Sequence, residues 1–148
     1  MQQKADILKT GAEILAPAMT AHGFAFSLGG QGHSSGGDFA FGWWTRRNRR
    51  LEMRVRFSLG LVAYHLGGDA VGHEWYIWAV TGKKHLAQYP GTSDDILAAF
   101  KHLHADIKQY CGAFLAGSDE ELKAIFSKVR ELENRWRRMS PLARLEIE

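Results

Sequence analysis

The residues of this sequence best suited to acid–base chemistry are two histidines, His65 and His73, on either side of the turn sequence GGDAVG. An imidazole titrates near pH 7 and can act as the general base in hydrolysis or proton transfer. Tyr64, Asp69 and Glu74 lie near the pair in the sequence and belong to the side-chain types that orient such a base. Two interpretations follow: a small-molecule-binding or hydrolase-type site at His65 and His73, or a structural histidine pair beside a turn.

Other sequence patterns that would carry chemistry are incomplete. His102 and His104 are two residues apart in a predicted helix and so point to different faces, and HExxH is missing, so no metal site is expected. Residues 29–38, GGQGHSSGGD, have glycines at the spacing of a nucleotide-binding loop, but Asp38 stands where that loop needs lysine. We predict a mobile hairpin loop here, with a ligand-gating flap as the alternative, and no cofactor.

Arginine is concentrated in one segment. Residues 39–58 contain six arginines and one glutamate, so the segment carries a net charge of +5, whereas the whole chain of 148 residues carries +3. The remaining residues are therefore net acidic by two charges. The segment has no lysine, and arginine forks beside tryptophan suit the bidentate capture of carboxylates or phosphates. The six are Arg46, Arg47, Arg49, Arg50, Arg54 and Arg56.

The element expected to position these arginines is an antiparallel strand. Between residues 50 and 57, charged side chains alternate with apolar ones, which is the period of a strand with one face in the core and one in solvent. The apolar residues are Leu51, Met53, Val55 and Phe57.

The preceding segment, residues 39–46, is expected to pair with this strand, but the adjacent Trp43 and Trp44 make its register ambiguous. A two-residue turn at 48–49 would place the rings at 39, 41 and 43 beside the arginines, whereas a three-residue loop at 47–49 places them in the core. Burial of the rings is worth several kcal/mol and turn-type preference less, so we predict the three-residue loop. The candidate partner-binding residues on the polar face are then Trp44, Arg46, Arg54 and Arg56.

Three segments have the helical period: residues 4–22, 92–117 and 118–139. Pro17 is predicted to kink the first helix or split off its last turn. Ser118 and Glu121 form a capping box at the start of the third. Residues 73–81 fit a helix or a strand, and a short helix is favoured because Gly82 suits a helix C-terminus.

The order of these elements predicts a single α+β domain over residues 1–148. We expect an antiparallel β-meander of three to five strands, with the N-terminal helix and two or more C-terminal helices packed on one face. The last long helix has an apolar seam of less than three heptads, which favours packing within the chain over a homodimer through that helix.

Composition is that of a soluble globular protein, with 45% hydrophobic and 24% charged residues. No apolar run approaches the ~20 residues needed to cross a bilayer, and the N-terminus lacks the pattern of a secretory signal. The one cysteine, Cys111, lies in an apolar helical phase and is expected to be a buried hydrophobe. We therefore expect a cytoplasmic protein with no membrane partner.

A series of short motifs runs along the chain: GF after the first helix, SLGLVAYHLG, HEWY, YPG, and FLAG at the end of a helix containing Asp106. In this order they resemble uncharacterised bacterial cytoplasmic α+β families, some of which look like immunity proteins of toxin systems. The resemblance implies a binding protein and supplies no catalytic residues.

These observations predict a non-enzymatic binding protein that engages an acidic protein partner through an arginine- and tryptophan-bearing sheet face. Nucleic acid is the alternative ligand of the same face. We favour protein because the basic patch is small, the rest of the chain is net acidic, and no DNA- or RNA-binding signature accompanies it.

Overall fold

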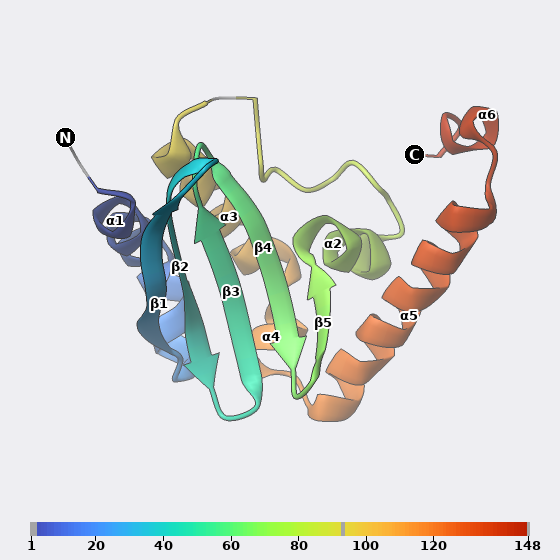
Figure 1. Ribbon diagram of the computed structural model, residues 1–148. Coiled ribbons are helices and arrows are strands. Elements are labelled where there is room, and N and C mark those ends of the chain that lie inside the picture. The colour runs from blue at the N-terminus through green and yellow to red at the C-terminus, as the bar shows by residue number, and fades with distance from the viewer. Residues whose placement is uncertain (1–2, 93, 148) are drawn as a thin grey trace.

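The computed structural model describes residues 3–92 and 94–147, which form an α+β fold (Figure 1). Within these residues, five strands form one antiparallel sheet in which each strand pairs with the next along the chain. The strands are β1 (Ala25–Ser34), β2 (Gly37–Arg46), β3 (Arg49–Val55), β4 (Leu59–Leu66) and β5 (Asp69–Gly72). The helices are α1 (Lys4–Met19), α2 (His73–Thr81), α3 (Ile96–Tyr110), α4 (Gly112–Ala116), α5 (Asp119–Arg138) and α6 (Pro141–Arg144). The predicted fold class is confirmed.

The helices α1, α3 and α4 lie behind one face of the sheet, and α5 runs alongside β5 and packs on α2 (Figure 1). Leu51, Met53 and Val55 of β3 are buried, at 0–1% exposure, which confirms the alternation expected for this strand. None of the described helices covers the opposite face of the sheet (Figure 1). The side chains that β2 and β3 direct to that face are therefore not covered by a described helix.

Helix ends follow the local sequence. Pro17 lies inside α1, and the chain continues after Met19 as a 3-10 turn over Thr20–His22, which confirms the split last turn. The segment after β5 is the favoured short helix, α2, and ends at Gly82 with a φ of 77°. The helix expected over residues 92–117 is interrupted at Cys111, so that α3 and α4 are separate.

The apolar seam of α5 is used within the chain. Ser118 caps the helix by accepting a hydrogen bond from the backbone N–H of Glu121 at 3.1 Å. The helix α5 packs against α2. The buried residues of α5 are Leu122, Phe126, Val129 and Leu132. A homodimer through this helix stays a prediction.

The predicted register of the β2–β3 hairpin is wrong. The turn has two residues, Arg47 and Asn48, so that Trp44 lies opposite Leu51 and Phe41 lies opposite Arg54. Trp44 is therefore in the core, at 4% exposure, and the three rings expected there lie on the other face. Burial in the core did not decide the register, because these rings are sheltered on the other face by arginine side chains and by β1.

The glycine-rich residues 29–37 were predicted to form a mobile loop, but most of them are strand. The strand β1 continues to Ser34, and residues 35–36 alone separate it from β2. A register shift between Leu28 and Gly30 leaves Gly29 as a bulge. Gly29, Gly30 and Gly32 are packed closely against aromatic rings of β2, so this part of the segment is strand and not an open loop.

Candidate binding face of the sheet

One face of the sheet carries aromatic rings in contact with arginines, and we call it the aromatic–arginine face. It consists of Phe39, Phe41 and Trp43 from β2 with Arg50, Arg54 and Arg56 from β3 and the turn after it. Each guanidinium carbon lies over one ring centroid: Arg50 over Trp43 at 4.1 Å, Arg54 over Phe41 at 5.0 Å, and Arg56 over Phe39 at 5.6 Å. Such cation–π contacts hold the long arginine side chains in a restricted set of conformations.

Glycines in β1 make this arrangement sterically possible. Gly30 lies opposite Phe41 and Gly32 opposite Phe39 in the β1–β2 pair. A Cβ atom at either glycine would come within 3.0 Å of the facing ring, and one at Gly29 would come within 2.6 Å of Phe41. Residues with side chains at these positions would push the rings away from β1, so the glycine-rich sequence is a packing requirement of the face.

Glu52 lies among the arginines and is hydrogen-bonded to two basic side chains. It accepts hydrogen bonds from His65 Nε2 at 2.9 Å and from Arg54 Nε at 3.2 Å. Partial burial alone would raise the pKa of Glu52, but these hydrogen bonds outweigh that effect and the pKa is lowered. Glu52 is therefore ionised at neutral pH, and the face carries three positive charges and one negative charge.

One end of the face is hollow and apolar. A cavity of about 370 Å³ is lined by aromatic, aliphatic and arginine side chains, among them Phe39, Phe41, Leu61 and Arg54. Phe57, which was expected to point into the core, is in the turn after β3 and is 76% exposed. A large exposed aromatic residue beside arginines is typical of a protein contact surface.

The four residues predicted to bind a partner lie on two faces. Arg54 and Arg56 belong to the aromatic–arginine face. Trp44 is buried on the helix side, and Arg46 also lies there, with its guanidinium carbon 4.7 Å from the ring centroid of Phe24. The correction follows from the two-residue turn, which reverses the facing of β2 relative to the prediction.

His65 and His73 are not brought together. His65 lies on the same face as Glu52, whereas His73 is buried and hydrogen-bonded to Tyr64 and Asp106. The two imidazoles therefore contact different groups on opposite sides of the sheet. Within residues 3–92 and 94–147, no cluster of three metal-ligating side chains is present.

His73 is instead part of a buried polar chain. Its Nε2 is 2.8 Å from Asp106 Oδ2 and its Nδ1 is 2.7 Å from the Tyr64 hydroxyl, which also accepts a hydrogen bond from the Cys111 thiol. All four side chains are at most 3% exposed. Burial raises the pKa of Cys111 to about 12, so its thiol is not a nucleophile at neutral pH.

Four residues of the aromatic–arginine face, three aromatic and one arginine, were not among the predicted partner-binding residues. Phe39, Phe41 and Trp43 were assigned to the core, and Arg50, although placed on the predicted strand, was not named as a partner-binding residue. The glycines of residues 29–37 could have indicated this arrangement. When glycines face a strand in which every second residue is aromatic, the rings can lie over the glycine-containing strand.

Comparison with known proteins does not extend these findings. No protein-family model matches the chain, and no curated protein or solved structure matches it. Of the helices in the described residues, none has both the length and the apolar composition needed to cross a membrane.

Proposed function

We propose that this protein is a non-enzymatic binding protein and that its aromatic–arginine face engages an acidic protein partner. The observation that carries the proposal is the set of three guanidinium groups held 4.1–5.6 Å from aromatic rings on a sheet face that no described helix covers. Side chains ordered before binding lose less conformational entropy when a partner binds.

Arg54 illustrates how a carboxylate would bind. Its side chain is 58% exposed, and its Nε donates to Glu52. Neither terminal amino group of Arg54 is hydrogen-bonded to any other described residue. These two groups are the donors that form a bidentate pair with a carboxylate.

The apolar end of the face supports a protein ligand over nucleic acid. The hollow and the exposed Phe57 provide a place for an aliphatic or aromatic side chain of the partner. The resemblance of the sequence to immunity-like families is also in keeping with a protein partner.

Site-specific photo-cross-linking tests the proposal. A benzophenone amino acid replaces Phe57 in one protein and Leu142 of α6 in the control; the two native side chains are 76% and 77% exposed. In a lysate of the source cells, we expect a protein adduct from position 57 and none from position 142. Adding Arg54→Glu with Arg56→Glu should abolish the adduct. Both changes replace a guanidinium group, which donates hydrogen bonds to a partner's carboxylate, with a carboxylate that would repel it.

The matched control is Arg135→Glu with Arg137→Glu, which changes the net charge equally on exposed positions of α5. This variant should retain the adduct at position 57. Equal adducts at both positions, or an adduct that survives reversal of Arg54 and Arg56, would refute the proposal. Binding of single-stranded oligonucleotides that weakens steeply with salt, together with loss of the adduct after nuclease treatment, would assign the face to nucleic acid instead.

A further inference from the structure

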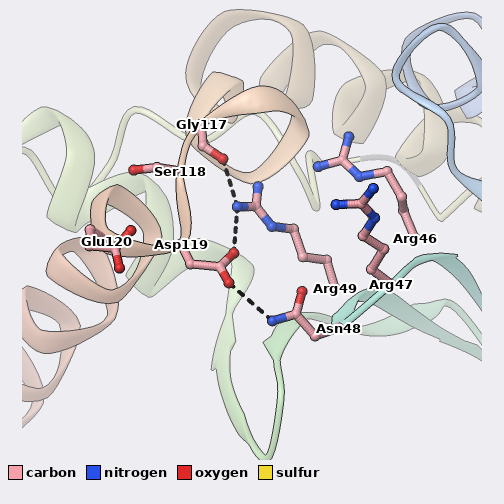
Figure 2. Close-up of a pocket in the computed structure, with 8 residues that line it drawn as sticks. All are labelled: Arg46, Arg47, Asn48, Arg49, Gly117, Ser118, Asp119 and Glu120. Carbon is pink, nitrogen blue, oxygen red and sulfur yellow. Dashed lines mark hydrogen bonds and ion pairs between the residues drawn. The ribbon is translucent and has the colours of Figure 1, made fainter.

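A second group of arginines surrounds a hollow at the end of the β2–β3 hairpin, away from the aromatic–arginine face. The hollow has a volume of about 620 Å³ and lies between the hairpin turn and the start of α5 (Figure 2). We call it the arginine hollow. Its lining has no apolar side chain and consists of Arg46, Arg47, Asn48, Arg49, Gly117, Ser118, Asp119 and Glu120.

Arg49 lines the arginine hollow and connects the β2–β3 hairpin to the residues around α4 and the start of α5. It is 4% exposed and donates to the carbonyl oxygens of Ala113, Phe114 and Gly117 at 2.6–2.9 Å. It also donates to Asp119 Oδ1 at 2.9 Å. Hydrogen bonds from Arg49 and then Asn48 hold the pKa of Asp119 below its ordinary value, so this carboxylate is ionised and already paired.

Arg46 and Arg47 differ from Arg49 because no carboxylate is paired with them. Arg46 Nη1 donates to the carbonyls of His22 and Leu115, both at 2.6 Å, and this fixes the side chain beside the hollow. Arg47 has no hydrogen bond or ion pair to any residue in the described ranges. Figure 2 shows the guanidinium groups of Arg46 and Arg47 next to each other, with Arg49 turned toward Gly117 and Asp119.

These like charges are crowded. Burial, and then the proximity of Arg49 and Arg47, lower the pKa of Arg46. The backbone of Arg47 is also held at a φ of 53°, a left-handed conformation that is uncommon for arginine. An anion between Arg46 and Arg47 would remove the repulsion between their charges.

We propose that the arginine hollow binds the phosphate group of a small polar molecule through Arg46 and Arg47. Two adjacent guanidinium forks match the several oxygens of a phosphate. A ligand that fills the volume needs polar groups elsewhere, since the lining is polar throughout. Glu120, on the α5 side of the hollow, is an acceptor for hydroxyl groups of such a ligand.

Thermal unfolding with defined probes tests the proposal. A hexose 6-phosphate and inorganic phosphate are compared with potassium chloride at equal ionic strength. With the probe at about ten times its dissociation constant, we expect the melting temperature to rise by about 3 °C or more. A larger rise with the ester assigns the site to phosphate esters, and equal rises assign it to free phosphate. No rise with either probe at about 10 mM would overturn the proposal, because a site for cellular metabolites must be filled at such a concentration.

The location is tested with Arg47→Asn. Asparagine tolerates the left-handed backbone, so the fold is retained while the guanidinium is lost. We expect the dissociation constant for the probe to rise about ten- to a hundredfold, as for loss of a charge-assisted hydrogen bond. The control is Arg137→Gln, which removes the same charge 18 residues along α5 from Asp119, or about 27 Å away. Equal weakening by both variants, or by neither, would overturn the assignment to the arginine hollow.

A third variant should change affinity in the opposite direction. With inorganic phosphate as the probe, which has no sugar hydroxyl groups for Glu120 to bind, Glu120→Gln removes a negative charge from the hollow and should tighten binding, whereas Glu131→Gln, at an exposed position of α5, should not. Weaker phosphate binding by Glu120→Gln would contradict the electrostatic argument. None of these variants alters the aromatic–arginine face, so this proposal and the proposed protein partner can fail independently.

Discussion

Replacement of Asp106 should show whether the buried polar chain organises the fold. Asp106 is 0% exposed and accepts three hydrogen bonds: from His73 Nε2 at 2.8 Å and from the backbone N–H groups of Gln88 and Tyr89 at 2.9 Å each. In Asp106→Asn, one carboxylate oxygen becomes an amide donor, so at least one buried N–H faces another donor. A buried donor without a partner costs about 1–3 kcal/mol. Asp106→Ala removes the acceptor for all three donors, and we expect a loss of about 3–5 kcal/mol, as for a broken buried pair.

The free energy of unfolding is measured by urea denaturation, with tryptophan fluorescence and circular dichroism as independent probes. Asp94→Asn is the control, because Asp94 is exposed and a surface substitution changes stability by about 0.5 kcal/mol or less. If Asp106→Asn is as stable as the wild type, the chain does not organise the fold, and the reasoning fails. Unchanged stability with loss of a measurable reaction would instead assign His73 a catalytic role.

Two further predictions concern the register and the buried acids. Trp44→Ala should lower the free energy of unfolding by about 3–5 kcal/mol, as for a core aromatic. Trp43→Ala should lower it by about 1 kcal/mol, mainly through loss of the contact with Arg50. If urea denaturation shows the larger loss for Trp43→Ala, the observed register is contradicted. Burial raises the pKa of both Tyr89 and Cys111 to about 12, so both groups are neutral in the folded protein at pH values where they ionise when unfolded. Each contribution is complete below the unfolded pKa of its group and should be lost as pH rises to about 12, from about pH 9 for Cys111 and from about pH 10 for Tyr89. Within each window the loss approaches about 1.4 kcal/mol per pH unit for that group. Urea midpoints that do not change between pH 9 and pH 11 would contradict this expectation.

Local patterns in the sequence predicted the elements well. The alternation in β3 was sufficient to identify its core side chains, because a period of two leaves one choice once the apolar face is known. Ser118 and Gly82 marked helix ends correctly, since capping depends on the residues at the end itself. These features need no knowledge of what lies across the sheet.

The pairing of β2 with β3 could not be predicted in the same way. A difference of one residue in the turn reverses which side chains share a face, and the choice depended on where Phe41 and its neighbours find shelter. That shelter comes from Arg54 on one side and Gly30 on the other, and each belongs to a different strand. The hydrogen bond between His73 and Asp106 joins residues that are 33 positions apart in the sequence. Local spacing carries no information about such a contact.

The two-residue turn also explains why the arginines of the hairpin do not form a single basic patch. Because strand residues alternate, Arg46 and Arg49 pair on the helix side, whereas Arg50 and Arg54 point to the uncovered face. One additional turn residue would exchange the faces of β2 relative to β3, separating the rings from the arginines and moving Arg46 away from the hollow. The turn length therefore sets the composition of both candidate sites, and a ligand that responds to Arg47 need not respond to Arg54.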